Sequence, residues 1–408
     1  MKAYKRRLSF FSILFTFFVD NLGWSIVFPI FAPLFLDPNN ILFTHNFTFA
    51  YRTAILGFFL AAFPLAQFFG SPILGEFADN IGRKKALIIS IFLTFLGYLL
   101  TGWSIQEKNL IVLFFARFLT GLFSGNLSVC LASISDLSAN ESSKAKNFGF
   151  LSALGGFSFI IGAFLGGKLS DPSVNKIFSF QFPIWIAAFL SFLNLLFIIF
   201  FFRETFIKFF KTKYKPFEGI ENIKKALETK GIKKIYLIYF LFVFAWTLLF
   251  QFSPVLVIKK FNFSNSQIGD LAAFMGICWI IGSAVVAKIL SKFFKNIKIL
   301  EVSLLVFTIL SAFVGLPKEI VYIVLLLGSC VLIGGVAWPI CTSIISNKSG
   351  RKNQGKIMGV TQSMQSLAMT ISPVIGGLSD RFYIYLPFII AGFASFIAAM
   401  IYLKVKLK

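Results

Sequence analysis

Long apolar runs separated by short polar breaks make up almost the whole chain. We count about twelve runs, since a bilayer core needs roughly 20 mostly apolar residues for each helical span. The runs cover residues 8–36, 52–76, 86–104, 109–136, 147–171, 181–202, 234–258, 266–292, 299–316, 320–346, 355–380 and 383–403. They lack the alternation of apolar and polar residues that is typical of a membrane β-barrel. The pattern therefore predicts an all-α membrane protein with about twelve transmembrane helices.

The composition strengthens this interpretation. Of the 408 residues, 57% are hydrophobic and 57 are phenylalanine, and the mean hydropathy is +0.84. A soluble domain could not bury so much apolar surface, so we expect a multi-pass protein that contacts the lipid bilayer of a cytoplasmic (inner) membrane. The sequence has one histidine and four cysteines in no metal-ligand spacing. We therefore expect neither an enzyme nor a bound metal or cofactor.

The formal net charge of +23 would suit a nucleic-acid partner. The distribution of this charge along the chain argues against a nucleic-acid partner. With the N-terminus in the cytoplasm and alternating helices, roughly 30 Lys and Arg residues fall on the inside and roughly 8 on the outside. The positive charge is therefore a topology signal, and no nucleic-acid partner is expected. It predicts that both termini and the polar segment 203–234 are cytoplasmic.

That polar segment divides the runs six and six. We predict an N-terminal half at 1–202, a linker at 203–233 and a C-terminal half at 234–408. The fifth run ends GAFLGGKLSD and the eleventh ends SPVIGGLSD, at equivalent places in the two halves. This repeat favours a duplicated transporter-like architecture over chance similarity, and we expect the protein to be a monomer. Small residues in both segments are expected to pack helices closely; they are Gly162, Gly166, Gly167, Pro373, Gly376 and Gly377.

Charge is concentrated at GEFADNIGRKKAL, Gly75–Leu87, between the second and third runs. The segment resembles the signature loop of the major facilitator superfamily, G-x-L-A-D-R-x-G-R-K-x-x-L. The resemblance implies a charge cluster at a cytoplasmic gate that latches the two halves, with an acid from the end of the fourth span. The residues here that match those places are Gly75, Asp79, Gly82, Arg83 and Asp136.

Further matches point to the drug:proton antiporter branch, with a first half similar to tetracycline-efflux proteins. Asp20 and Arg117 lie in segments that resemble the first- and fourth-span motifs, and Gly162–Gly167 resembles the fifth-span antiporter motif. The resemblance implies alternating-access, proton-coupled efflux of a drug-like or amphipathic compound. Ala163 stands where that motif has proline. A proton-coupled nutrient or metabolite importer on the same fold therefore remains an alternative.

Ionisable groups in mid-membrane are costly and are candidates for function. Asp20 lies roughly 18 Å into the first span and Arg117 roughly 12 Å into the fourth from the other side, at 1.5 Å per residue. The two meet at a similar depth, so they are candidates for proton coupling and could neutralise each other across the cavity.

Aromatic and amide residues accompany these charges on helices expected to face a central cavity. Such a lining with one acid suits an amphipathic or cationic solute. The candidates are Asn21, Trp24, Asn126, Trp246, Gln251, Trp338, Gln362 and Gln365. The sequence contains no GxxxxGK[ST] phosphate-binding loop, so we do not expect direct drive by ATP.

The topology can be tested by labelling single cysteines from outside the cell. A cysteine at position 45, in the first outer loop, should react with a membrane-impermeant maleimide. A cysteine at position 220, in the linker, should react only after the membrane is permeabilised, because the positive-inside distribution keeps that segment in the cytoplasm. Labelling of 220 but not 45 in intact cells would reverse the whole map.

Overall fold

The computed structural model describes the chain except for residues 1–2, 38–41, 44–46, 125, 139–140, 206–220, 222–223, 225–232, 349–353 and 407–408. Helices joined by short turns make up the described part, and it contains no strand. The predicted all-α fold is therefore confirmed. Position 45 and most of the predicted linker lie outside the described residues, so the domain boundaries stay predictions.

The first half of the chain contributes eight helices or helix segments. They are α1 (Ala3–Ile26), α2 (Phe28–Leu36), α3 (Phe49–Ile81), α4 (Arg83–Gln106), α5 (Leu110–Phe123), α6 (Asn126–Leu137), α7 (Glu141–Leu169) and α8 (Phe182–Phe201). Two of the predicted spans are broken: α1 and α2 form the first, and α5 and α6 form the fourth. The first break falls at Val27, just before Pro29, whose ring removes a backbone donor from the helix.

The helices of the second half are α10 (Lys233–Phe261), α11 (Asn265–Ile280), η1 (Ile281–Val286), α12 (Ala287–Phe293), α13 (Asn296–Phe313), α14 (Ile320–Lys348), α15 (Gln354–Asp380) and α16 (Leu386–Lys406). In this half the spans equivalent to the two broken ones, α10 and α14, are continuous. The segments α11, η1 and α12 form one continuous span with a π-helical middle. Gly282 lies in that middle and faces the backbone of Leu332 on α14.

Eleven spans in the described chain are long and apolar enough to cross a membrane. The twelfth predicted span, 355–380, corresponds to α15, which is a continuous helix of 27 residues but is less apolar. Its polar side chains include Gln362 and Gln365, which line a cavity inside the bundle. Because α15 packs against α3 and α10, it can carry these amides without presenting them to lipid.

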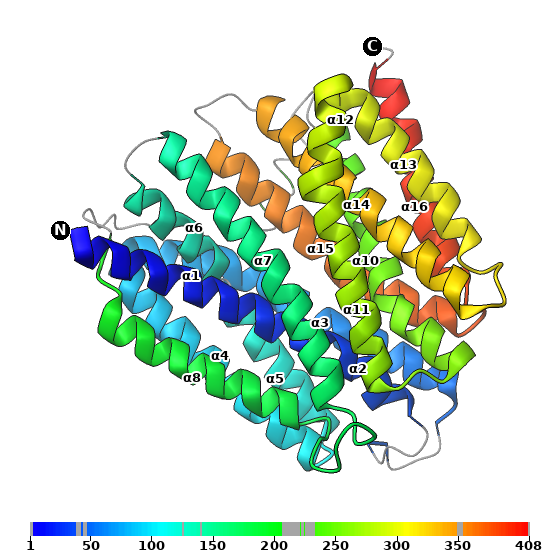
Figure 1. Ribbon diagram of the computed structural model, residues 1–408, viewed down its shortest axis with the longest axis horizontal. Coiled ribbons are helices and arrows are strands. Elements are labelled where there is room, and N and C mark those ends of the chain that lie inside the picture. The colour runs from blue at the N-terminus through cyan, green and yellow to red at the C-terminus, as the bar shows by residue number, and fades with distance from the viewer. Residues whose placement is uncertain are drawn as a thin grey trace.

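The blue-to-green helices of the first half lie beside the yellow-to-red helices of the second half (Figure 1). We call the end of the bundle that carries the connections α4–α5, α7–α8 and α10–α11 the outer end, and the opposite end the inner end. Two helix pairs join the halves extensively, α3 with α15 and α7 with α11. Both pairs bring backbone to backbone near the outer end.

Each of these pairs is built on two facing glycines. A Cβ added to Gly167 would lie 2.5 Å from the Cα of Gly269, and one added to Gly377 would lie 3.1 Å from the Cα of Gly57. In each pair a backbone carbonyl oxygen of one helix also lies close to the glycine of the other: that of Ala163 lies near Gly269, and that of Pro373 lies near Gly57. Ala163 and Pro373 each stand four residues before the glycine of their own helix, so the two contacts have the same geometry. The two contacts are therefore equivalent under the duplication. We call them the paired glycine contacts.

The remaining glycines of the two repeated segments pack within their own halves. Gly162 and Gly166 lie against the backbone of α1, near Leu22 and Ile26, and Gly376 lies against the ring of Phe252. All six small residues singled out from the sequence thus lie at helix contacts.

The paired glycine contacts should control how the outer end opens. Gly167→Ala places a methyl group where the backbone of α11 already lies, so the closed outer end loses roughly tenfold or more in population. Double electron–electron resonance between spin labels at the exposed Lys176 and Lys318 should show a larger share of long distances.

The matched control for this prediction is Gly149→Ala. It lies on the same helix, but an added Cβ meets nothing within 4 Å. It should keep the wild-type distance distribution. A wild-type distribution in Gly167→Ala as well would show that these contacts do not hold the outer end closed.

Candidate functional site

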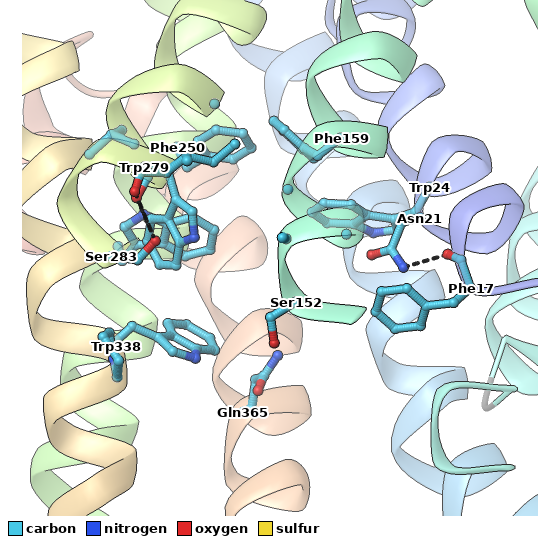
Figure 2. Close-up of a pocket in the computed structure, with 18 of the residues that line it drawn as sticks. Phe17, Asn21, Trp24, Ser152, Phe159, Phe250, Trp279, Ser283, Trp338 and Gln365 are labelled. Carbon is cyan, nitrogen blue, oxygen red and sulfur yellow. Dashed lines mark hydrogen bonds between the residues drawn. The ribbon is translucent and has the colours of Figure 1, made fainter. Parts of the chain in front are cut away.

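A cavity of about 720 Å³ lies between the two halves. This volume is within the usual range for small-molecule sites. Helices from both halves line it, with Asn21 and Trp24 on one side and Trp279 and Trp338 on the other (Figure 2). Its lining continues toward the inner end, at Ser152 on α7 and Ser283 on η1. The cavity is therefore closed by the paired glycine contacts at the outer end and extends inward from them.

Three tryptophans of the second half form one wall of the cavity. The ring centroids of Trp246 and Trp279 are 4.8 Å apart, those of Trp279 and Trp338 are 5.5 Å apart, and those of Trp246 and Trp338 are 5.8 Å apart. Each comes from a different span, so their meeting is a tertiary feature. Such a wall presents large, rigid aromatic surfaces to an apolar or cationic ligand.

A row of aromatic rings crosses from this wall to the first half. Phe250 stacks on Trp246 at 5.2 Å and contacts Phe159 on α7 at 5.8 Å, and Phe159 contacts Trp24 on α1 at 5.7 Å. The row lies on the outward side of the cavity, between it and the tightly packed outer end. These rings, which come from both halves, form the apolar outward boundary of the cavity.

Most of the residues chosen from the sequence do line this cavity. They are Asp20, Asn21, Trp24, Trp246, Trp338, Gln362 and Gln365. Two do not. Asn126 is fully buried behind Asp20, where its side-chain oxygen accepts a hydrogen bond from the hydroxyl of Ser90. Gln251 instead lines a separate, smaller cavity farther outward. Neither residue lines the main cavity, because the rotation of a helix about its axis depends on the helices packed around it.

The expected neutralisation of Asp20 by Arg117 is also not found. In the described part of the chain no ion pair joins them. The Arg117 guanidinium instead lies over the rings of Phe31 and Phe63, 5.2 and 4.8 Å from their centroids. Tyr98 interacts electrostatically with both charges, and its hydroxyl lies against Gly23 on α1. In the described part of the chain Arg117 therefore contacts aromatic rings and not the carboxylate of Asp20.

Several lining residues were not chosen from the sequence. Trp279 and Ser283 come from the span that contains the π-helical segment, and Gln67 and Ser152 come from α3 and α7. Trp279 carried a usable signal, since a tryptophan so far from either end of a span is not at a membrane interface. The serines and Gln67 carried none, because only packing decides which face of a helix meets the cavity.

The second site is the charge cluster at the inner end of the first half. Helix α3 ends at Ile81, and Gly82 turns the chain with a φ of 99°, a conformation that favours glycine. Arg83 begins α4 and pairs with Asp79 at 2.6 Å and with Asp136 at 3.6 Å. The structure thus brings the signature-loop charges and the acid of the fourth span together. The open space around Gly75 does not explain why glycine stands there.

Glu204 completes this cluster, and sequence reasoning missed it. Its carboxylate accepts hydrogen bonds from the backbone N–H groups of Arg83 and Lys84, both at 3.0 Å. These groups form the first turn of α4, where a helix has unpaired donors and a favourable dipole for an anion. Thr205 donates a hydrogen bond to Asp136 at 3.4 Å. The sequence did offer a signal for Glu204, because it is an acid at the start of a strongly basic segment.

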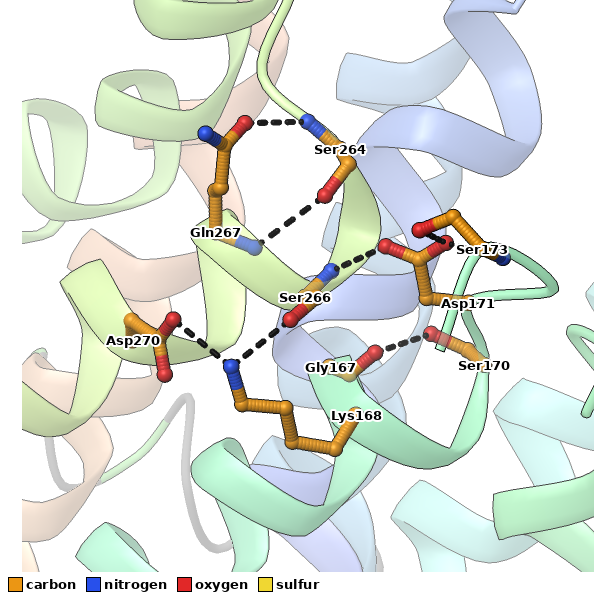
Figure 3. A network of polar contacts seen from close by, with 9 residues as sticks. All are labelled: Gly167, Lys168, Ser170, Asp171, Ser173, Ser264, Ser266, Gln267 and Asp270. Atoms are coloured by element: carbon orange, nitrogen blue, oxygen red, sulfur yellow. Dashed lines mark hydrogen bonds and ion pairs between the residues drawn. The ribbon is translucent and has the colours of Figure 1, made fainter. Parts of the chain in front are cut away.

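A third polar group joins the halves at the outer end (Figure 3). Lys168 on α7 pairs with Asp270 on α11 at 2.8 Å and donates to the hydroxyl of Ser266 at 2.7 Å. The Asp171 carboxylate accepts from the backbone N–H of Ser266 at 2.9 Å, at the start of α11. These contacts surround the pair Gly167 and Gly269. The outer closure therefore combines backbone packing with charge.

Asp171 stays ionised in this position. Burial would raise the pKa of its carboxyl, but hydrogen bonds from Ser173 and from the backbone of Ser266 outweigh burial and lower the pKa below its ordinary value. The repeated Asp380 in the second half lies 3.9 Å from Lys259. Each copy of the repeated segment thus ends in an acid beside a partner at the outer end.

A membrane protein whose two halves enclose a central, ligand-sized cavity is a transporter by class. The comparisons with known proteins agree. The family model described as Major Facilitator Superfamily matches residues 13–373. The chain belongs to this superfamily; it is a multi-pass membrane transporter of small molecules and not an enzyme.

Named relatives refine the comparison. The chain is 26% identical over 371 residues to the tetracycline resistance protein, class H, of Pasteurella multocida, covering 88% of this chain and 85% of that protein. It is 25% identical over 398 residues to multidrug resistance protein 2 of Bacillus subtilis, covering 95% and 93%. The resemblance to the drug:proton antiporter branch is thereby confirmed.

Solved structures show the same fold. The human organic anion transporter MFSD10 (TETRAN) aligns with a TM-score of 0.72 at 16% identity, over 97% of this chain and 99% of that one. A D-xylose–proton symporter aligns with a TM-score of 0.75 at 16% identity, over 97% and 98%. Both identities are low, so these neighbours establish the architecture alone.

The inner charge cluster should control the rate of transport rather than binding. Asp79→Asn, Arg83→Ala and Glu204→Gln each remove a charge that holds the α3–α4 turn. We expect transport to slow about two- to fivefold, the effect of partly exposed ion pairs, with unchanged ligand affinity, because none of these residues lines the cavity.

The measurement is initial uptake into proteoliposomes beside equilibrium binding in detergent. Lys85→Gln is the matched control, since it removes an exposed basic charge of the same loop and should leave both values unchanged. Loss of binding in Arg83→Ala with an unaltered conformational balance would contradict a role as a gate.

Proposed function

We propose that the protein is a proton-coupled exporter of drug-like, amphipathic organic compounds in the cytoplasmic membrane, with both termini in the cytoplasm. The observation that carries this proposal is the central cavity with a tryptophan wall, several amides and the single carboxylate of Asp20. Its apolar surfaces suit the body of an amphipathic compound, and its amides suit the polar groups. The family relatives named for tetracycline and multidrug resistance support export.

Alternating access follows from the arrangement of contacts. The paired glycine contacts and the Lys168–Asp270 ion pair close the outer end. With the termini inside, this conformation faces inward, where an exporter loads its substrate. Separation of α7 from α11 and of α3 from α15 would expose the same cavity to the outside, so each pair is a contact that the cycle must break.

Asp20 is the proposed proton carrier. It lies on α1 in the cavity, and the polar side chain of Asn126 is within hydrogen-bonding reach behind it. One proton that moves inward across a potential of ~100 mV releases about 2.3 kcal/mol. At tenfold for each 1.4 kcal/mol, this supports roughly a 50-fold gradient of a neutral solute. Arg117 provides a buried positive charge in the same half of the chain.

Import of a nutrient or metabolite is the second candidate. Ala163 replaces the proline of the antiporter motif, and it is fully buried with its carbonyl facing Gly269. Flux of tetracycline in inside-out vesicles, with and without a pH gradient, separates the two directions. An exporter accumulates the drug in these vesicles when their interior is acidic, whereas an importer on the same proton gradient depletes it.

Asp20→Asn tests the coupling. An amide cannot exchange a proton in the working pH range, so pH-driven accumulation of tetracycline in proteoliposomes should fall to an inside-to-outside ratio of about one. Downhill exchange of the drug should persist, because the cavity keeps its shape.

Glu107→Gln is the matched control for this variant. It removes an exposed acid of the same half at the end of α4, and accumulation should be retained. Full proton-driven accumulation in Asp20→Asn would mean that another group carries the proton or that the transporter is not proton-coupled.

A further inference from the structure

A second, smaller cavity lies outward of the main one, between the halves. Its volume is about 50 Å³, which exceeds what one water molecule needs and matches a small polar group. Trp24, Phe63 and Met369 line both cavities, so the two adjoin at these side chains. The small cavity therefore continues the main one toward the closed outer end.

Arg117 gives this small cavity a charge. Its side chain lines the cavity, and the residue is 5% exposed. The Nη1 atom is buried without a hydrogen-bond partner in the described part of the chain, and no carboxylate there pairs with the guanidinium. The rings of Phe31 and Phe63 offer only cation–π contacts. A buried cation with an unpartnered Nη1 donor group is costly, so this position favours an arriving anion.

Gln251 supplies a second polar group on the opposite side. It comes from α10 in the second half and lines the same cavity, and its amide oxygen is also buried without a partner. The amide carries both donors and an acceptor, so a turn of its end presents an N–H to an anion. The remaining lining is almost wholly apolar, with Phe28, Phe59 and Pro254 among it.

We propose that Arg117 and Gln251 form an anion-binding subsite that takes the carboxylate of the transported compound while its aromatic body lies in the main cavity. A guanidinium matches a carboxylate with two parallel hydrogen bonds, and the pairing is strong where water is excluded. The substrate is then an amphipathic organic anion or a zwitterion, whose positive group would lie near Asp20. A purely cationic solute, which the sequence left open beside an amphipathic one, would leave Arg117 unpaired.

This inference rests on the proposed function for the idea that the main cavity receives an amphipathic compound. It does not depend on the direction of transport or on proton coupling. Equilibrium binding without any gradient tests it separately.

The test uses three probes that share a nitrobenzene ring and quench tryptophan fluorescence. They are 4-nitrobenzoate, the neutral 4-nitrobenzamide and the cation 4-nitrobenzyltrimethylammonium, titrated against the full-length protein in detergent. Trp24 and the tryptophan wall report occupancy of the cavity. We expect 4-nitrobenzoate to bind at least about tenfold more tightly than the amide, the usual worth of a buried charge-assisted pair.

Substitutions locate that preference. In Arg117→Gln the affinity ratio of benzoate to amide should fall to about one, and in Gln251→Leu it should fall several-fold. Arg117→Lys keeps a charge without the planar fork and should retain part of the ratio. Circular dichroism and melting temperature verify folding. If Arg117→Gln does not fold, Arg117→Lys and Gln251→Leu decide the question.

Arg52→Gln is the matched control. Arg52 is another buried arginine of the first half, but it already donates to the backbone oxygens of Phe47 and Asp37. Its loss should leave the ratio at the wild-type value.

Three results would overturn the proposal. The first is equal affinity for benzoate and amide in the wild type, or tighter binding of the trimethylammonium probe. The second is an undiminished preference for benzoate in Arg117→Gln or, if that variant does not fold, in both Arg117→Lys and Gln251→Leu. The third is binding of acetate as tight as that of 4-nitrobenzoate, which would make the subsite one for a free anion. A preference that survives in Asp20→Asn would support the subsite even if proton coupling failed.

Discussion

The close approach of helix backbones between the two halves is the constraint on which this structure depends. Gly167 meets Gly269, and Gly377 meets Gly57, without room for a Cβ on any of the four. Apolar side chains cannot hold two membrane helices together by the hydrophobic effect, because lipid is equally apolar, so association relies on close packing and on polar contacts. Here the packing lies at the outer end, and the ion pair of Lys168 with Asp270 lies directly beside it. Because the halves are joined at that end, they can enclose a cavity below it.

The cavity then gathers polar groups that the membrane would otherwise exclude. Asp20, Gln362 and Gln365 come from spans at opposite ends of the chain, yet they line one space. α15 shows the consequence most clearly, because it is the least apolar of the predicted spans and lies against both halves. Arg117 is the exception, because it does not line this main cavity. It is buried among aromatic rings rather than paired with an acid, which is the physical reason to expect an anionic group on the substrate.

Charge at the inner end has a different character. Arg83 is joined to Asp79 and Asp136, and Glu204 caps the helix that Arg83 begins. These contacts link the second, third, fourth and sixth spans, so they stiffen the first half as one body. A half that moves as a rigid unit can transmit a change at its inner end to the glycine contacts at its outer end. The bundle is therefore suited to open at one end while it closes at the other.

The sequence alone predicted the class of fold, the family and the eleven spans of the described chain that are long and apolar enough to cross a membrane. Runs of apolar residues and the signature loop are local features, and their physical meaning does not depend on distant residues. The charge cluster that the loop's resemblance implied contains Asp79 and Arg83, and these two residues do pair, four residues apart at a turn that Gly82 permits. The glycines of the repeated segments could be recognised as packing residues, although not the partners Gly57 and Gly269.

Only the tertiary structure decided which residues share a site. Trp246, Trp279 and Trp338 come from three spans, and their mutual contact depends on the rotation of each helix about its own axis. In a span that is apolar on every side, the sequence has no periodic signal from which to read that rotation. For the same reason Asn126 turned out to be buried behind Asp20, and Arg117 turned out to lie over aromatic rings instead of beside that acid. Depth in the membrane can be counted along a helix, but the direction in which a side chain points is set by the helices packed around it.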